Sequence, residues 1–306
     1  MRYDREESSS TPQGNAPAAA AAQQIDGATW TDSAASAASA VTRDTRPGAL
    51  IVGASSGIGA ALARRLVARG WRVALVARQR ERLDALCAEL NNVPAAARAQ
   101  ARADVSDGRL AAVAYAYTCD VTEASAAPAL FARITEEVAP LRLVIYAAGT
   151  MPRVTTGQSF DDERAVIEVN VIGALRWLGL AATYLEREGR GTLVGISSVA
   201  GDRGRPGNGA YMASKAALST YLDALRYRLK PHGVRVLTAK PGYVATGMTA
   251  GLKLPKPLTI SADRAAAGIL RAVDRGRAVA YVPGYWSPIM RLVRALPRSA
   301  VARMPG

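Results

Sequence analysis

The sequence predicts an α/β protein built on a single doubly wound parallel sheet with helices on both faces. Short apolar runs of strand length alternate with Ala- and Leu-rich runs of helical pattern, and the first apolar run leads directly into a glycine-rich turn and a helical run. Alternation of this kind is typical of parallel sheets, whose strands are joined by crossover helices. The expected strands are residues 48–52, 72–77, 111–118, 141–147, 192–196 and 234–239, and the expected helices are residues 60–69, 81–90, 161–186 and 211–230.

We expect residues 1–46 to form a disordered tail ahead of one folded domain over residues 47–306. The tail is rich in Ala, Ser, Thr and Gln and has almost no Leu, Ile, Phe or Val, so it cannot bury enough apolar surface to offset the entropy of ordering. It has no basic start followed by an apolar segment, which argues against a secretory signal. No apolar run in the sequence approaches the ~20 residues expected of a membrane span.

The formal net charge is +14 at pH 7, and the tail does not supply it, because its four arginines face six acidic residues. A basic folded part favours anionic partners, such as a phosphorylated cofactor, an anionic membrane surface or nucleic acid. The positive charge is dispersed and no module of stacking aromatics is present, so we expect no nucleic-acid partner. Cys87 and Cys119 are expected to be reduced, packed thiols, and we expect a cytoplasmic protein without a bound metal.

The glycine-rich turn reads Gly53-Ala-Ser-Ser-Gly57-Ile-Gly59. A strand, a tight glycine turn and a helix N-terminus in this order place backbone N–H groups and the positive end of the helix dipole against an anion. The spacing differs from the commoner Gly-x-Gly-x-x-Gly of Rossmann-type dinucleotide folds, but the context is the same. The candidate cofactor contacts in the turn are Gly53, Ser55, Ser56, Gly57, Ile58 and Gly59.

The same letters fit the Gly-x-Ser-x-Gly pattern of a hydrolase, with Ser55 in the place of the nucleophile. The single histidine, His232, lies in Lys230-Pro-His-Gly233 between a helix and the next strand, where we expect a solvated loop residue. A nucleophile elbow would also follow several strands, and the tail provides none. The partners therefore argue against an esterase.

Arg78 directly follows the second strand, with Arg80 and Arg82 beyond it. In a dinucleotide fold an acidic residue near this point binds the ribose 2′-hydroxyl of NAD, whereas arginine accommodates the 2′-phosphate of NADP. No Asp or Glu ends this strand, so the sequence favours NADP(H) over NAD(H). After the third strand, Asp120 is preferred to the similar Asp104-Val-Ser because a strand precedes only Asp120.

Tyr211 and Lys215 are four residues apart in a helical run, and so lie on one face of the helix. A nearby ammonium stabilises a phenolate, which would lower the Tyr211 pKa and make the side chain a usable acid/base. Ser198 follows the strand at residues 192–196 and would meet the tyrosine across the mouth of a site. Farther upstream, Asn170 and Gly173 interrupt a long helix, and their poor helix propensity predicts a local distortion there.

Together these residues resemble the short-chain dehydrogenase/reductase family over nearly all of residues 47–306. The resemblance implies that Ser198 polarises a substrate carbonyl, that Tyr211 passes the proton, and that Lys215 tunes Tyr211 and holds the nicotinamide ribose. It also implies that Asn170 supports a proton-relay water and that the protein is a homo-oligomer. The further cofactor contacts that it implies are Asp120 and Val121 at the adenine, with Ala148, Gly149, Pro241, Gly242, Val244 and Thr246 along the rest of the site.

Two positions depart from the family pattern: Val52 precedes Gly53 where many members have Thr, and Tyr146-Ala-Ala-Gly149 replaces Asn-Asn-Ala-Gly. Within the family, residues 197–306 look similar to reductases of decaprenylphosphoryl 2-keto sugars, which implies a lipid-linked substrate. Reduction of another ketone, such as a 3-oxoacyl, steroid or small ketone, remains an alternative. A non-catalytic dinucleotide-binding scaffold is a second alternative, although binding alone does not require the four catalytic positions.

Two C-terminal segments complete the expected site. Residues 246–260, with Pro255 and Pro257, are expected to form a substrate lid. Within residues 281–306 the side chains of Trp286, Ile289, Met290, Val293 and Leu296 recur at helical spacing, while Arg291, Arg294 and Arg298 fall on other faces. Such a basic amphipathic segment either packs onto the sheet or a partner subunit, or lies at an anionic membrane surface at the inner face of the membrane.

Overall fold

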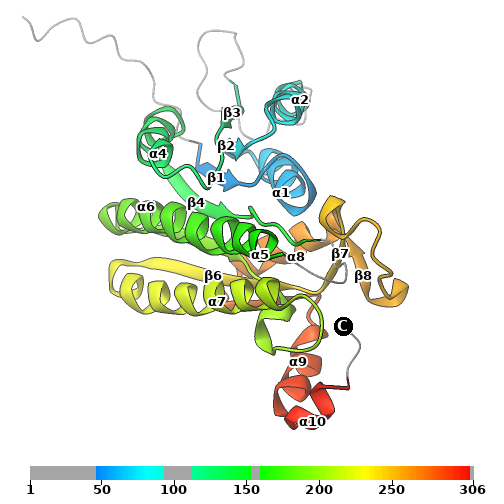
Figure 1. Cartoon of the computed structure of the whole chain (residues 1–306). Coiled ribbons are helices and arrows are strands. Elements are labelled where there is room, and N and C mark those ends of the chain that lie inside the picture. Colours follow the sequence, from blue (N-terminus) through cyan, green and yellow to red (C-terminus); the bar gives the residue numbers. More distant parts are fainter. Residues whose placement is uncertain (1–45, 93–111, 153–158, 304–306) are drawn as a thin grey trace, which may run out of the picture. The chain divides into compact units, whose positions relative to one another are not determined.

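A computed structural model describes residues 46–92, 112–152 and 159–303 (Figure 1). In this described part, seven parallel strands form one sheet in the order β3-β2-β1-β4-β5-β6-β9. The predicted doubly wound parallel sheet is thereby confirmed. The expected tail, apart from Arg46, and Asp104 lie outside the described residues. The strands are β1 (Gly48–Val52), β2 (Arg72–Ala77), β3 (Ala114–Thr118), β4 (Leu141–Tyr146), β5 (Gly191–Ile196), β6 (Val234–Pro241) and β9 (Val279–Val282).

Helices cover both faces of the sheet, and alternate residues of β1 divide between the two cores. Ala49 and Ile51 pack into the core beneath α1, α2 and α8, whereas Leu50 and Val52 pack into the core beneath α4, α6 and α7. This alternation follows from the two-residue period of a strand. Figure 1 shows α6 and α7 side by side over one face. The helices are α1 (Gly57–Val67), α2 (Arg80–Asn91), α4 (Ala126–Glu137), α5 (Phe160–Ile167), α6 (Gly173–Glu188), α7 (Gly209–Leu229), α8 (Ala262–Asp274), α9 (Trp286–Ala295) and α10 (Arg298–Val301).

The strand order reverses at β1, which pairs with β2 on one side and with β4 on the other. The chain passes from β1 to β2 on one side of the reversal, and from β4 to β5 on the other side. In such sheets ligands bind outside the carboxyl ends of the strands at the point of reversal. The glycine turn after β1 and the Ala147–Gly149 stretch after β4 both lie at this point, so the topology places the expected cofactor site there.

The predicted distortion of the long helix is confirmed. Residues Glu168–Ile172 form a π-helical turn, η2, between α5 and α6. Tyr146 is part of one departure from the family pattern. Its hydroxyl donates a hydrogen bond of 2.6 Å to the Val169 carbonyl in this turn. A Cβ at Gly173 would lie 2.7 Å from that hydroxyl oxygen. Gly173 and Tyr146 are therefore matched to each other at the distortion.

The combined stretch Phe160–Glu188 spans 29 residues and contains an 18-residue window with a mean hydropathy of 1.5, so by length and composition alone it resembles a membrane span. This differs from the expectation that no run approaches that length. Half of its apolar window is buried inside the protein, and Trp177, Leu178 and Ala181 are fully buried in the core beneath α6. Core packing accounts for its apolar character.

The C-terminal part contains strands that the periodicity did not indicate. The edge strand β9 pairs with β6 over four residues, and β7 (Tyr243–Ala245) pairs with β8 (Thr259–Ser261) over three, so each run is too short for a clear alternation. The expected lid lies between β7 and the end of β8 and carries two short 3-10 turns, η5 (Gly247–Thr249) and η6 (Lys256–Leu258). The predicted C-terminal helix is present as α9.

Candidate active site

The glycine turn after β1 forms a cradle of backbone at the N-terminus of α1. Gly53 has φ +90°, and a Cβ at Gly53 would lie 2.3 Å from the Ala148 nitrogen. A Cβ at Gly59 would lie 2.1 Å from the Gly53 oxygen. The turn can therefore close onto β4 and onto its own helix only with glycine at both positions.

This cradle fits a dinucleotide pyrophosphate. Ser56 is the N-cap of α1, but its side chain makes no capping hydrogen bond, so the first-turn amides still point outward with the positive end of the helix dipole. A Cβ at Gly57 would meet the Thr246 methyl group at 3.3 Å, which shows that the expected lid reaches the turn. The residues present suit a bound NAD(P), with the phosphates at the α1 N-terminus.

Arg78 and Asp120 lie just beyond the ends of the neighbouring strands β2 and β3, where the adenosine half of a dinucleotide would lie. The Arg78 Nη1 is 3.5 Å from Asp120 Oδ2, and 63% of the Arg78 side chain is exposed. Burial acts to raise the pKa of Asp120, but hydrogen bonds from the Thr122 nitrogen and hydroxyl, with Arg78 nearby, lower it overall. Asp120 is therefore an anion held in a turn, and Arg78 is an exposed cation beside it.

Ser198, Tyr211 and Lys215 come together from the end of β5 and the first turns of α7. The helix begins here because Asn208 caps it, its Oδ1 accepting a hydrogen bond of 3.2 Å from the Tyr211 nitrogen. Ser198 Oγ accepts from the Ala200 nitrogen at 3.1 Å and contacts the Pro241 oxygen at 3.5 Å. Lys215 Nζ donates to the Ile196 oxygen at 3.0 Å and lies 5.7 Å from the centre of the Tyr211 ring.

The pKa of Tyr211 differs from the sequence-based expectation. Burial raises the pKa of Tyr211 above its usual value, and a hydrogen bond with Ser198 only partly opposes this. The Lys215 ammonium donates its hydrogen bond to the Ile196 carbonyl, and the net shift of the Tyr211 pKa is upward. Burial also lowers the pKa of Lys215 to about 8. In the ligand-free protein Tyr211 is thus protonated at neutral pH and ready to donate.

Asn170 is fully buried in η2, and its side chain is fully engaged. Its Oδ1 accepts from the Thr150 nitrogen at 2.8 Å, and its Nδ2 donates to the Thr150 oxygen at 2.9 Å and to Ser214 Oγ at 3.0 Å. The side chain therefore joins the loop after β4 to α7 on the turn between Tyr211 and Lys215. Its role for a relay water stays a prediction, since these contacts are structural.

One cavity of about 540 Å³ contains most of the expected site. Its lining includes Ser198, Tyr211 and Lys215 of the expected catalytic set. From the expected cofactor set, the residues that line it are Gly53, Ser55, Ser56, Gly57, Ile58, Gly59, Arg78, Val121, Ala148, Gly149, Pro241, Gly242, Val244 and Thr246. Asn170 and Asp120 do not line this cavity, but each contacts a residue that does: Asn170 contacts Thr150, and Asp120 contacts Arg78.

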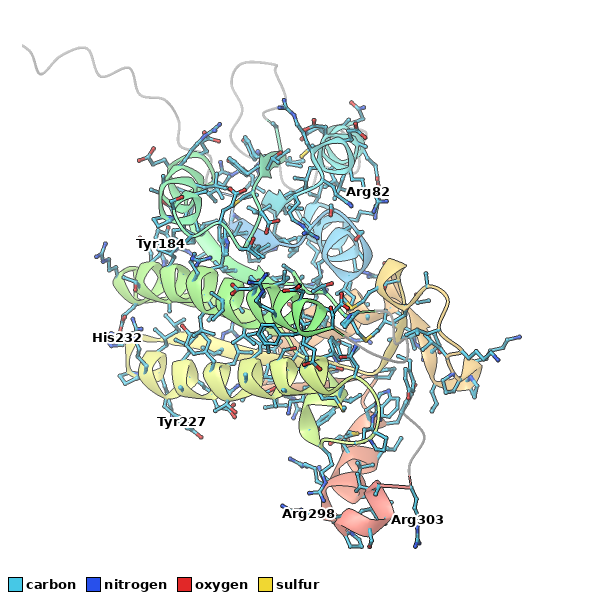
Figure 2. The ribbon with its side chains drawn as sticks, viewed as in Figure 1. Arg82, Tyr184, Tyr227, His232, Arg298 and Arg303 are labelled. Atoms are coloured by element: carbon cyan, nitrogen blue, oxygen red, sulfur yellow. The ribbon has the colours of Figure 1, made fainter. Side chains whose placement is uncertain are left out.

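Sequence reasoning missed several residues of the site. Ser197 donates a hydrogen bond of 2.9 Å to the Lys215 oxygen and lies 2.8 Å from Ser219 Oγ, so it fixes the turn of α7 that carries Lys215. Its position directly before Ser198 is the signal that could have identified it. Gln79 and Arg82 also line the cavity, and Arg82 extends from α2 (Figure 2). Met248 and Thr249 line it from the expected lid.

The hydrolase alternative fails in the structure. Ser55 lies in the glycine turn and lines the cavity, but His232 ends the short turn η4 (Lys230–His232) and its Nε2 is 3.2 Å from Glu186 Oε1. Figure 2 shows His232 at the outer end of α7, away from the turn after β1. Ser55 therefore has no histidine base.

The known proteins to which this chain is similar are dehydrogenases and other oxidoreductases. A family model described as short chain dehydrogenase matches residues 48–256. An uncharacterized oxidoreductase of Mycobacterium tuberculosis is 34% identical over 261 residues, covering 84% of this chain and 96% of that protein. An uncharacterized oxidoreductase of Myxococcus xanthus is 34% identical over 250 residues, covering 81% of this chain and 92% of that protein. A solved short-chain dehydrogenase from Sphingobium yanoikuyae in complex with NADPH has a TM-score of 0.65 and 26% identity, covering 84% of this chain and 99% of that chain.

Proposed function

We propose that this protein is an NADP(H)-dependent enzyme that interconverts a ketone and a secondary alcohol. The premise is that the chain belongs to the short-chain dehydrogenase/reductase family and is an oxidoreductase with a dinucleotide-binding site. One observation carries the proposal. The cavity that contains the glycine cradle is also lined by Ser198, Tyr211 and Lys215. A binding scaffold would need the cradle alone, whereas this cavity adds a hydroxyl, a phenol and an ammonium at its other end.

The residues of the site divide the work of carbonyl reduction. NADPH held at the glycine turn and Arg78 would supply the hydride for the carbonyl carbon. The contact that the Ser198 hydroxyl donates to the Pro241 oxygen is long, at 3.5 Å, so its proton can turn to the carbonyl oxygen and stabilise the developing negative charge. Tyr211, whose pKa burial raises, holds the proton that the alkoxide takes up. Lys215, at 5.7 Å from the Tyr211 ring centre, stabilises the phenolate that remains.

The substitution Tyr211→Phe tests this proposal because it removes the proton donor and keeps the ring. We expect turnover of the wild type's best carbonyl substrate to fall by about 10² to 10⁴-fold, with NADPH affinity retained. The substrate is chosen by following NADPH oxidation with polyprenyl-phosphate keto sugars, 3-oxoacyl thioesters and simple ketones. Tyr227→Phe is the matched control, since Tyr227 lies on the same helix and is 75% exposed (Figure 2).

Two results would contradict the proposal. Full turnover by Tyr211→Phe would exclude this tyrosine as the acid. NADPH binding without oxidation by any carbonyl, in wild type as in the variant, would instead favour the scaffold.

We propose NADP(H) in preference to NAD(H) as the cofactor. Arg78 and Arg82 both line the cavity at the adenosine end, and β2 ends without an acidic residue, which is the arrangement that accommodates a 2′-phosphate. The similar Sphingobium yanoikuyae enzyme was solved with NADPH, which supports the proposal.

We propose further that the substrate is a lipid-linked keto sugar presented at an anionic membrane surface. Trp286 and Met290 pack inward from α9, which is the packing alternative for that side of the helix, but Ile289 is 36% and Leu292 is 66% exposed. Arg298 begins α10, which follows α9, and adds positive charge to this C-terminal segment (Figure 2). A basic residue near such a surface contributes on the order of 1 kcal/mol. The expected homo-oligomer and cytoplasmic location stay predictions.

A further inference from the structure

Three polar side chains that do not line the cavity meet where η3 (Val199–Asp202), β6 and β9 come together. Asp202 Oδ1 accepts a hydrogen bond of 2.5 Å from Lys240 Nζ, and Asp202 Oδ2 accepts one of 2.7 Å from the Tyr281 hydroxyl. Only 1% of the Asp202 side chain and 12% of the Lys240 side chain are exposed. Lys240 and Tyr281 are partners in the parallel β6–β9 ladder, and the Lys240 ammonium lies 5.7 Å from the Tyr281 ring centre.

This cluster joins the two chain segments that meet at Ser198. Asp202 ends the turn that begins at Ser198, and the Ser198 oxygen accepts a hydrogen bond of 3.1 Å from Gly201 within it. Lys240 directly precedes Pro241, whose oxygen is 3.5 Å from Ser198 Oγ. The Asp202–Lys240 contact thus bridges these segments a few residues behind the serine. On the other side of the turn, a Cβ at Gly201 would lie 2.6 Å from the Lys215 carbonyl carbon, so the turn also rests on α7.

Stability alone gives a weak reason for such a cluster. Burying a carboxylate and an ammonium costs several kcal/mol per ion before their attraction is counted, and well-packed apolar residues often do as well or better. An ion pair with a tyrosine on the second oxygen does, however, fix direction. Both carboxylate oxygens of Asp202 are held, one by each of two neighbouring strands, so the turn can neither slide along the sheet nor rotate about one contact.

We propose that Asp202 is a positioning residue for Ser198, which it holds at the carbonyl oxygen of the substrate through its contacts with Lys240 and Tyr281. None of the three lines the described cavity, so they act on the reaction through Ser198 and Pro241. The inference rests on the proposed reductase function. The inference goes beyond that function by assigning a role in the chemistry to a cluster that does not line the described cavity.

The first test is Asp202→Asn in the full-length protein. A misplaced polarising group costs up to about 10²-fold, so we expect kcat for the carbonyl to fall by about 10 to 100-fold. The Kd of NADPH, measured by fluorescence titration, should stay within about twofold because the cradle lies at the other end of the cavity. Glu137→Gln is a matched control: Glu137 accepts 2.6 Å hydrogen bonds from Tyr117 and from Arg133, and so joins a tyrosine to a cation far from the site.

The second test places Asp202→Asn in the Ser198→Ala background. If Asp202 acts through Ser198, its substitution should have almost no further effect on kcat once that hydroxyl is gone, whereas independent effects would multiply. Tyr281→Phe, which removes one hydrogen bond and keeps the ring, should give a smaller loss with the same dependence on Ser198. Thermal unfolding of every variant shows whether it is folded at the assay temperature. If Asp202→Asn is unfolded there, the comparison of Tyr281→Phe with and without Ser198 tests the positioning role instead.

The outcomes separate this inference from the proposed function. If Ser198→Ala itself leaves turnover intact, the proposed chemistry is wrong. If Ser198→Ala lowers turnover but the Asp202 and Tyr281 substitutions reduce kcat by the same factor with and without Ser198, or do not reduce it, the positioning role is overturned.

Discussion

Removal of the Arg78 guanidinium should change which cofactor the enzyme prefers. Arg78 directly follows β2, 63% of its side chain is exposed, and its Nη1 lies 3.5 Å from Asp120 Oδ2. That distance is at the limit of a hydrogen bond, so the guanidinium can turn to a 2′-phosphate without giving up a strong contact. An NADH molecule has only a hydroxyl at this position and gains little from the arginine.

The expected magnitude follows from that exposure. A hydrogen bond to a charged group contributes about 1.5 to 3 kcal/mol, and solvent screening at an exposed side chain places this one at the lower end. A loss of about 1.5 to 2 kcal/mol corresponds to roughly 10 to 30-fold in affinity. Arg78→Ala should therefore weaken NADPH by that factor and change NADH by less than about twofold.

Michaelis constants and dissociation constants for both cofactors, in wild type and variant at one fixed salt concentration, measure the change. Arg80→Ala is the matched control, because Arg80 pairs with Asp84 at 3.5 Å on α2 and does not line the described cavity. It removes the same charge from the same neighbourhood. The reasoning is refuted if the wild type has no preference, if Arg78→Ala weakens both cofactors equally, or if Arg80→Ala has the same effect.

Two further predictions concern Lys215 and α9. Burial lowers the pKa of Lys215 to about 8 from 10.5, so the unfolded chain holds this proton over a range in which the folded protein has lost it, and stability relative to Lys215→Met should rise with pH between these values. At pH 7 the ligand-free Lys215→Met protein should have a free energy of unfolding in urea that is higher by on the order of 2 kcal/mol. The pKa shift of Lys215 corresponds to about 3 kcal/mol, and loss of the hydrogen bond to the Ile196 oxygen costs about 1 kcal/mol. A difference in unfolding free energy that does not change with pH would contradict this. The double variant Ile289→Ser, Leu292→Ser should sediment less with anionic vesicles than the wild type does, while zwitterionic vesicles should bind neither and the exposed Phe160→Ser should act as wild type. Equal sedimentation of all three proteins with anionic vesicles would exclude α9 as the contact.

The fold was predictable because its signals are local. β1, the glycine turn and α1 are contiguous in the chain, and the strands at the sheet centre are mostly apolar and almost entirely buried. The strand β9 escaped because it is a four-residue edge strand whose first residue, Val279, is 40% exposed. Periodicity also could not say which side of α9 faces the body: Trp286 and Met290 pack inward, while Ile289 and Leu292, at neighbouring positions, do not.

The candidate site was predictable in its residues and less so in its electrostatics. The Tyr211–Lys215 spacing places both on one side of α7, but the direction of the Tyr211 pKa depends on burial by other elements and on the Ile196 carbonyl that takes the Lys215 ammonium. The Asp202 cluster lies beyond any local pattern. Asp202 is 38 residues from Lys240 and 79 from Tyr281, and only the pairing of β6 with β9 brings them together.

Buried polar contacts hold the residues at the carboxyl end of the sheet, where an apolar core of the same size could fold without them. Lys215 is buried with its ammonium on one carbonyl, Asn170 has every side-chain group engaged, and Asp202 is almost fully enclosed. Each is costly to bury, and the two apolar cores along the sheet have to offset that cost. If these groups were present for stability, apolar replacements would weaken the fold. We expect the opposite at Lys215, so the fold is the scaffold whose surplus stability allows charged groups to be held where a carbonyl is to be reduced.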